Sequence, residues 1–218
     1  MKSLFKKIII AFSIVFILVL TYSHFYDPSN EQYSLDYSLK RQITNKMPHY
    51  VELDKIPENL INATIAMEDK RFYSHGGFDI IAIARATITD ISEGRIVQGG
   101  STITQQLAKN LFFSNRKSIT RKLKELIVAT KLEHMFTKDD ILEMYLNIIY
   151  YGAGAHGANE ASHAFFSKDV NNLTLEECAM LAGLPQAPSI YNPVSSLSTA
   201  RKRQELVMSV MMKNGYIN

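Results

Sequence analysis

Apolar residues first form one long uninterrupted run near the N-terminus and afterwards recur at helical spacing. Residues 8–20 are almost entirely apolar, and aromatic positions extend this run to about residue 26. With the apolar residues just before it, the run reaches roughly the 20 residues that a helix needs to cross a bilayer. Three lysines lie within residues 1–7, which keeps the N-terminus in the cytoplasm under the positive-inside rule. We therefore predict a cytoplasmic tail over residues 1–7 and a transmembrane anchor over residues 8–26.

Two alternatives for this apolar run are a cleaved signal peptide and a buried core helix. A signal peptide would be followed by a small-x-small cleavage site, but residues 22–26 read Tyr-Ser-His-Phe-Tyr. The flanking lysines and the terminal position count against a core helix. An uncleaved anchor is the preferred interpretation.

Behind the anchor, the pattern is first polar and then helical. Residues 27–50 are polar with little periodicity, so we predict a linker, with a short strand at residues 51–53. From Pro57 onward, apolar residues recur at helical spacing nearly to the C-terminus, and few segments alternate as strands do. Residues 51–218 are therefore predicted to form one mainly α domain.

Start and stop signals place the individual helices. Pro57 suits a first helical position, Asp79 can cap the next helix and Gly94 can end it. Thr174 and Glu177 form a capping-box pattern ahead of a later helix. The predicted helices cover residues 57–68, 79–94, 101–113, 118–136, 137–149 and 174–184.

Composition agrees with one folded domain and excludes some functions. A chain of 218 residues can bury a sizeable core, and 46% hydrophobic with 21% charged residues is typical of globular proteins. A net charge of +3 gives no reason to expect a nucleic-acid partner. The single cysteine, Cys178, cannot form an internal disulfide, and its apolar helical surroundings favour a core residue over a nucleophile.

Glu68 is the first candidate for chemistry. It closes a predicted helix just before Arg71, His75 and two glycines. A carboxylate at a helix end, beside a glycine turn that a substrate can approach, is well placed to act as a general base. The alternative is a surface glutamate paired with Lys70 or Arg71. For His75, a hydrogen bond to nearby backbone is preferred over a catalytic role.

Residues 99–106 read Gly-Gly-Ser-Thr-Ile-Thr-Gln-Gln, a glycine turn that leads into a helix. Backbone amides, the helix dipole and the hydroxyls of Ser101 and Thr102 suit an anionic oxygen such as a phosphate, although an ordinary N-cap has the same pattern. No Gly-Lys-Ser/Thr follows, so this is not a nucleotide P-loop. The amides of Gln105 and Gln106 can bind sugar hydroxyls.

Glu125 is the second candidate and lies in a basic segment. Arg121 and Lys122 precede it by one helical turn, and Lys109 and Asn110 extend the same polar surface. One interpretation is an i,i+4 salt bridge to Arg121, worth only a few tenths of a kcal/mol. The other is a cationic funnel for a diphosphate, in which the neighbouring cations hold Glu125 ionised.

Five motifs occur in order over roughly residues 55–195, which makes a chance match negligible. They are Glu68-Asp69-x-x-Phe72-x-x-His75-x-Gly77, Gly99-x-Ser101-Thr102-Ile103-Thr104-Gln105-Gln106, Arg121-Lys122-x-x-Glu125, Ile141-Leu142-Glu143-x-Tyr145-Leu146-Asn147, and Leu-Ala-Gly-Leu-Pro-Gln-Ala-Pro-Ser-Ile-Tyr-Asn-Pro over residues 181–193. In these motifs the chain resembles the monofunctional peptidoglycan glycosyltransferases, whose domain also begins the bifunctional penicillin-binding proteins.

The resemblance implies an all-α, lysozyme-like domain with a small mobile lobe, which we place near residues 86–117. It implies polymerisation of lipid II into glycan strands, with inversion at the donor's anomeric carbon and release of undecaprenyl diphosphate. Glu68 would be the general base that deprotonates the acceptor 4-hydroxyl. Glu125 would assist departure of the diphosphate or hold a divalent cation (Mg²⁺ or Mn²⁺) beside it.

The resemblance also implies partners and a location. These are lipid II, the growing glycan and membrane lipid, with penicillin-binding or division proteins as assembly partners, and no nucleic acid. The catalytic domain would lie outside the cytoplasm, held by one span in the bacterial cytoplasmic membrane. Predicted substrate contacts are Ser101, Thr102, Gln105, Gln106, Lys109, Arg121 and Lys122, with Arg85 and Lys117 as weaker candidates.

The chain departs from the family pattern in places, and two other functions also fit parts of its sequence. The family's Tyr-Phe-Gly-Lys is Phe-Phe-Ser-Lys at residues 165–168, and the chain ending at Asn218 leads us to expect no transpeptidase activity. The alternatives are a membrane-anchored, lysozyme-like muramidase and an inactive cell-wall assembly scaffold. A basic cluster suits a diphosphate substrate better than finished glycan, and no Asp-x-Asp motif supports a nucleotide-sugar transferase.

Overall fold

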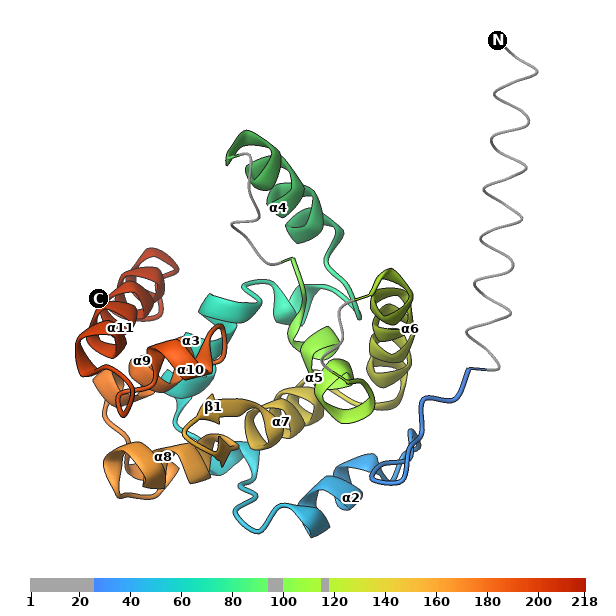
Figure 1. Ribbon diagram of the computed structural model, residues 1–218, viewed down its shortest axis with the longest axis horizontal. Helices are drawn as coiled ribbons and strands as arrows, with labels where there is room; N and C mark the ends of the chain where they lie inside the picture. The colour runs from blue at the N-terminus through green and yellow to red at the C-terminus, as the bar shows by residue number, and fades with distance from the viewer. Residues whose placement is uncertain (1–25, 94–99, 115–117) are drawn as a thin grey trace.

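The computed structural model describes residues 26–93, 100–114 and 118–218, and within these ranges the chain is mainly helical (Figure 1). The mainly α prediction is thereby confirmed. Short 3-10 turns lie at Leu53–Lys55, Phe72–Ser74 and Val170–Asn172. The α-helices are α2 (Leu39–Lys46), α3 (Glu58–Glu68), α4 (Ile80–Glu93), α5 (Ile103–Phe112), α6 (Ile119–Met135), α7 (Lys138–Ile148), α8 (Ala158–Phe166), α9 (Leu175–Gly183), α10 (Pro188–Tyr191) and α11 (Leu197–Lys213).

The predicted membrane anchor, residues 8–26, lies outside the described residues except for Tyr26, and it stays a prediction. Among the helices described, none combines the length and apolar character needed to cross a bilayer. The Tyr26 carbonyl accepts a hydrogen bond from Lys131 Nζ at 2.6 Å, and Lys124 Nζ lies 5.1 Å from the centre of the Tyr26 ring. The chain that follows the predicted anchor therefore begins against α6.

Side-chain caps explain why the helices begin where the sequence predicted. Thr137 and Asp140 form a reciprocal capping box at α7, as Thr174 and Glu177 do at α9. Asp79 accepts a hydrogen bond from the Ala82 amide at 2.8 Å and so caps α4. These predicted helix starts are confirmed, whereas the predicted end of α4 at residue 94 lies outside the described residues.

The segment expected to be a linker instead contributes to the core. Within residues 27–50, helix α2 buries Leu39 and Ile43 completely and packs against α7. Two apolar side chains one turn apart gave too short a periodic signal for a helix prediction. Helix α2 gains its stability from burying this pair against a neighbouring helix, as short helices generally must.

The short strand predicted at residues 51–53 is wrong. The amide of Val51 donates to Asn147 Oδ1 at 2.8 Å, and that of Leu53 donates to Glu143 Oε2 at 3.0 Å. Side chains of α7 thus satisfy the backbone that a neighbouring strand would otherwise pair. The described strands lie elsewhere, in an antiparallel hairpin of β1 (Tyr150–Gly152) and β2 (Ala155–His156).

Helix α7 forms the centre of the domain. Its residues from Ile141 to Ile148 are all buried, with α5 and α6 packed on one side and α8 on another. Helix α3 packs against α9 and α11. This arrangement brings the C-terminal end of α3, which carries Glu68, toward the N-terminal half of α5.

The predicted lobe at residues 86–117 needs a correction. Helix α5 lies inside that range but belongs to the core, because Ile103 and Leu107 are completely buried. Helix α4 projects from the body in Figure 1, and Ile80 and Ile88 on it are 70% and 69% exposed. Burial of the apolar face of α5 decides its place, and the sequence motif alone could not show what that face packs against.

Candidate active site

A polar pocket lies where the end of α3, the start of α4, the loop before α5 and helix α11 meet. Its lining brings together predicted site residues that are far apart in the sequence. These are Glu68, Arg85, Ser101, Thr102 and Gln106. Residues that the sequence analysis did not assign to a site also line it, among them Asp79, Gln186 and Arg203.

Glu68 ends helix α3 and is fixed by a chain of two hydrogen bonds. Gln106 Nε2 donates to Glu68 Oε2 at 2.7 Å, and the hydroxyl of Tyr145 donates to Gln106 Oε1 at 3.3 Å. Burial raises the pKa of Tyr145 well above its usual value, so the hydroxyl keeps its proton. The tyrosine therefore sets which end of the Gln106 amide faces the carboxylate.

The second carboxylate oxygen of Glu68, Oε1, is not used in the contacts that hold this side chain. Among the described residues, Oε1 has no hydrogen-bond partner, and the half-buried side chain lines the pocket. Burial raises the pKa of Glu68, while the hydrogen bond from Gln106 and the positive charge of Arg203 lower it and Asp69 raises it. A carboxylate with a raised pKa and an open oxygen is suited to accept a proton. The surface ion pair with Lys70 or Arg71 is not formed.

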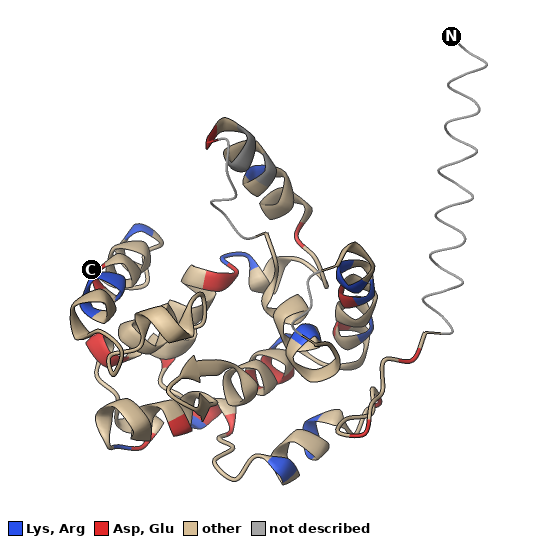
Figure 2. Ribbon diagram, in the orientation of Figure 1, with Lys and Arg blue, Asp and Glu red and all other residues tan. Residues whose placement is uncertain are grey.

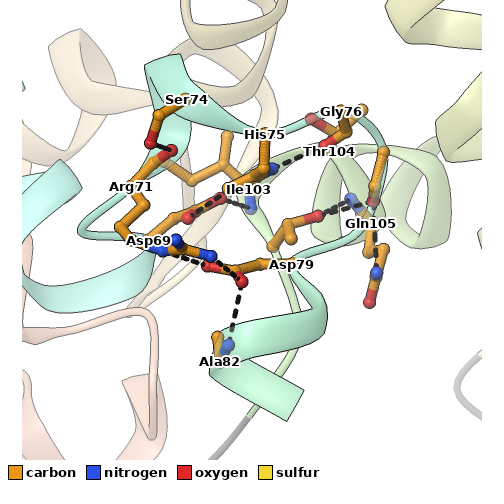
Figure 3. Close-up of polar contacts among 12 residues, drawn as sticks. Asp69, Arg71, Ser74, His75, Gly76, Asp79, Ala82, Ile103, Thr104 and Gln105 are labelled. Atoms are coloured by element: carbon orange, nitrogen blue, oxygen red, sulfur yellow. Dashed lines mark hydrogen bonds and ion pairs between the residues drawn. The ribbon is translucent and has the colours of Figure 1, made fainter. Parts of the chain in front are cut away.

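Asp69 and His75 form a buried pair beside the pocket (Figure 3). His75 Nε2 lies 2.7 Å from Asp69 Oδ1, and Nδ1 lies 2.6 Å from the Gly76 carbonyl. Burial lowers the pKa of His75, but these contacts outweigh it and the pKa is raised. The predicted backbone hydrogen bond of His75 is confirmed. Asp69 Oδ2 also accepts from the Ile103 amide at 3.1 Å, which joins the end of α3 to the start of α5.

Asp69, His75 and Asp79 place potential ligand atoms within 4.8 Å of one another, so we tested them as a cation site. Arg71 forms an ion pair with Asp79, with its Nε 3.0 Å from Oδ2, and His75 occupies Asp69. The hydrogen bond from Arg71 holds the pKa of Asp79 down at about 2. A divalent ion would have to displace a guanidinium already bound there. These residues do not fit a resident divalent cation.

The turn before α5 is held by hydrogen bonds to Gly77. Thr102 Oγ1 donates to the Gly77 carbonyl at 2.9 Å and accepts from the Gln105 amide, and Gln105 Nε2 donates to the same carbonyl at 3.1 Å. A Cβ atom on Gly77 would lie 2.7 Å from the Thr130 amide nitrogen, so only glycine allows this approach to α6. Thr102 and Gln105 are buried and shape the turn, and Gln105 does not line the pocket.

Lys122 connects the second glutamate to the pocket. Its Nζ donates to Ser101 Oγ at 2.7 Å and to Gln105 Oε1 at 3.0 Å, and it lies 3.4 Å from Glu125 Oε2. Arg121 Nε lies 3.1 Å from Glu125 Oε1, although the pair lacks the alignment of a hydrogen bond. The predicted i,i+4 ion pair is confirmed.

Figure 2 shows the Lys and Arg positions of the chain in blue, including those on α6 and α11.

The two glutamates do not share one pocket in this structure. Glu125 is buried with only 2% exposure and does not line the pocket that holds Glu68. Lys109 is half-buried on α5 and also outside the lining, whereas the exposed Arg85 is part of it. Lys117 lies outside the described residues.

Arg203 and Gln186 line the pocket but were not predicted from the sequence. The hydrogen bond of Tyr145 to Gln106 was not predicted either. Tyr145 stands inside a recognised motif, so its position was available, but its contact with Gln106 depends on how α7 packs against α5. Arg203 stands more than a hundred residues from Glu68 in the chain, and no local pattern marks it. Packing of α11 against α3 brings it to the pocket.

A mainly helical domain with a half-buried carboxylate in a polar, basic pocket has the features of an acid–base enzyme acting on a polar substrate. Residues 37–212 match the protein family described as Transglycosylase. The chain belongs to this family of peptidoglycan glycosyltransferase domains. The recognised motifs and the family match therefore agree on a domain of the transglycosylase family.

Similar proteins include penicillin-binding proteins. The chain is 51% identical to penicillin-binding protein 1A of Aquifex aeolicus over 168 residues, covering 77% of this chain and 23% of the relative. It is 46% identical to penicillin-binding protein 1A of Escherichia coli over 185 residues, covering 85% and 22%. The chain thus spans about a quarter or less of these relatives' length.

A relative of more similar size comes from Cupriavidus necator and carries a name that describes it as a transglycosylase. It is 47% identical over 171 residues, which cover 78% of this chain and 74% of that protein. Among solved structures, penicillin-binding protein 1A of Haemophilus influenzae matches with 27% identity and a TM-score of 0.46, covering 78% of this chain and 16% of that one.

Proposed function

We propose that this protein polymerises lipid II into glycan strands, with Glu68 as the general base. The observation that carries the proposal is the Glu68 carboxylate: it is oriented through Oε2 by Gln106, its Oε1 is open, and it faces a pocket lined by Ser101 and Arg85. Glu68 takes the proton from the acceptor 4-hydroxyl as that oxygen attacks the donor's anomeric carbon. The bond from that carbon to the diphosphate breaks, and undecaprenyl diphosphate leaves with the electron pair.

The leaving diphosphate needs cations opposite the base, and the proposal assigns them to α6. Lys122 reaches the edge of the pocket through Ser101 and lies in an ion pair with Glu125. We assign Glu125 the task of holding Lys122 and Arg121 in place, from where they neutralise developing charge on the diphosphate. The ion pairs leave Glu125 poorly placed to transfer a proton itself. Lys109, Gln105, Thr102 and Lys117 stay predicted substrate contacts.

The requirement for Mg²⁺ or Mn²⁺ stays a prediction, and no step above depends on it. The anchor over residues 8–26, with the catalytic domain outside the cytoplasm, is part of the proposal, because an anchored enzyme and a lipid-linked substrate share one surface and so gain effective concentration. Assembly with penicillin-binding or division proteins and the lack of transpeptidase activity also stay predictions.

The rival function is that of a muramidase, which would hydrolyse glycan with acids of the same pocket. Hydrolysis of a glycosidic bond generally uses two carboxyl groups that flank the bond. Besides Glu68, the acids that line this pocket are Asp69 and Asp79, and they are bound to His75 and Arg71. The pocket therefore favours transfer from an activated diphosphate, which already is a good leaving group, over hydrolysis of finished glycan.

The test is incubation of the full-length protein in detergent with labelled lipid II, with and without a divalent cation, and separation of the products by size. Muramidase-sensitive polymer is expected from the wild type and none from Glu68→Gln. Glu58→Gln is the matched control, because Glu58 is exposed at the start of the same helix. Cleavage of finished glycan without polymer formation favours the muramidase, and neither activity from folded protein favours the scaffold.

A further inference from the structure

Arg203 reaches the Glu68 pocket from helix α11, at the opposite end of the chain. Its Nε donates to the Gly183 carbonyl at 3.0 Å, and its guanidinium carbon lies 5.0 Å from the centre of the Tyr191 ring. Both contacts are of kinds that hold a planar guanidinium in one orientation. Residues of α9 and α10 thus fix a side chain of α11.

Helices α9 and α11 pack closely at Gly183, which leaves room for the aliphatic part of the Arg203 side chain. A Cβ atom on Gly183 would lie 2.8 Å from Arg203 Cγ and 3.3 Å from Val207 Cγ2. Glycine is therefore needed at this position, because a larger residue would collide with the Arg203 side chain where α9 and α11 meet. Arg203 is half-buried, and its guanidinium is held by the Gly183 carbonyl and the Tyr191 ring.

Arg203 and Glu68 face one pocket without forming an ion pair. In the part of the chain that the structure describes, no carboxylate lies within 4.0 Å of a guanidinium nitrogen of Arg203. The two other acids of the pocket have their own cationic or imidazole partners. Glu68 instead has the neutral amide of Gln106. Its negative charge therefore has no direct counter-ion among the described residues, although the Arg203 guanidinium is fixed at the same pocket.

We propose that Arg203 is a positioning residue that keeps the Glu68 carboxylate ionised and ready to accept a proton. The proposal rests on the proposed function of Glu68 as the base. A direct ion pair would occupy the oxygen that must take the acceptor's proton. A guanidinium fixed at a distance stabilises the negative charge through space and leaves Oε1 open.

Among the described residues, no other charged group around Glu68 can replace Arg203. Burial and the adjacent Asp69 raise the pKa of Glu68, and Arg203 is the cation that acts against them. Lys70 and Arg85 are exposed, so solvent and salt screen their charges, and Arg71 is neutralised by Asp79. Burial raises the pKa of the phenols of Tyr145 and Tyr151, so these side chains are uncharged. Besides Asp69 and Arg203, the charged or titratable groups that line the pocket or interact with Glu68 are Lys70, Arg71, Asp79, Arg85, Tyr145 and Tyr151.

The test compares Arg203→Gln and Arg203→Lys in the full-length protein. Arg201→Gln is the matched control, because it removes one positive charge from an exposed position of the same helix. Lipid II polymerisation is measured across pH, and the Glu68 carboxyl is titrated by carbon-13 NMR with Glu68→Gln to assign its signal. Loss of the positive charge in Arg203→Gln should make Glu68 easier to protonate. We therefore expect the titration midpoint of Glu68 and the acid side of the pH–activity profile to move to higher pH. Activity should return in alkaline buffer. Arg203→Lys should retain most of the wild-type profile, and Arg201→Gln all of it.

A loss of equal size at every pH, or a higher KM with an unchanged Glu68 titration, would overturn the proposal and make Arg203 a substrate contact. If Arg203→Gln does not fold, Tyr191→Leu replaces it, since loss of the ring contact should move the titration in the same direction by less. An unmoved midpoint in folded Tyr191→Leu then contradicts the proposal. A wild type that makes no polymer refutes the proposed function, whereas the NMR titration still decides the role of Arg203.

Discussion

The hydrogen bond from Tyr145 to Gln106 yields a prediction that separates orientation of the base from general stability. Tyr145→Phe removes the hydroxyl that lies 3.3 Å from Gln106 Oε1 and leaves the fully buried ring in place. Gln106 Oε1 then loses its hydrogen-bond donor, so the amide that donates to Glu68 Oε2 is held less firmly. The base is then oriented less firmly, so polymerisation should slow while the domain stays folded.

The size of the effect follows from the strength of such a bond. A neutral intramolecular hydrogen bond contributes about 0.5–1.5 kcal/mol, and the Tyr145 bond is long for its type. If that energy is lost from the transition state, the rate falls roughly 2- to 10-fold. Tyr50→Phe is the matched control, because it removes a phenol that donates to Glu143 on the same helix α7, away from the pocket.

The assay is a double-mutant cycle in initial rates of lipid II polymerisation, with urea unfolding measured alongside. In Gln106→Ala, Tyr145→Phe should cause no further loss of rate, since the tyrosine acts through the amide. Tyr50→Phe should lower the free energy of unfolding without slowing the folded enzyme. If Tyr145→Phe lowers the rate equally in the wild type and in Gln106→Ala, the tyrosine does not act through the Gln106 amide, and the reasoning is refuted.

Three further predictions concern stability. Asn147→Ala should lower the free energy of unfolding in urea by about 2–3 kcal/mol, because this buried amide makes three hydrogen bonds of 2.8 Å to the backbone; a loss below about 0.5 kcal/mol would contradict this. Gly77→Ala should destabilise the fold by about 1–3 kcal/mol, since the added Cβ meets the Thr130 backbone at 2.7 Å, and an unchanged thermal midpoint would show that the backbone yields freely. The pKa of Asp79 is lowered to about 2 beside Arg71, so its stabilising effect is present above its unfolded pKa and is lost as pH falls toward 2. Wild type and Asp79→Asn should therefore differ in stability at pH 6 and converge near pH 2, whereas a constant difference would contradict the ion pair as the cause.

Much of the helical arrangement could be predicted because its signals are local. The capping boxes at Thr137 and Thr174 act within one turn of the chain, and the structure shows both. The β1–β2 hairpin could not be predicted, because its strands are only three and two residues long. Helix α2 was missed because its stability depends on what Leu39 and Ile43 pack against.

The candidate site was predictable as a set of residue types and less so as a geometry. Glu68, Ser101 and Gln106 lie in recognisable motifs, and the structure brings them to one pocket. The sequence could not show that Glu125 is turned into a buried ion pair with Arg121, since both a salt bridge and a cationic funnel fit its spacing. Arg203 could not be predicted from a local pattern, because the packing of α11 against α3 brings it to the pocket of Glu68.

The most direct test of the central claim is the rate of glycan polymer formation from labelled lipid II by wild type, Glu68→Gln and Glu58→Gln, each shown to be folded by circular dichroism. We predict muramidase-sensitive polymer from the wild type and Glu58→Gln at equal rates, and none above background from Glu68→Gln. Polymer from Glu68→Gln at the wild-type rate would contradict the assignment of Glu68 as the base.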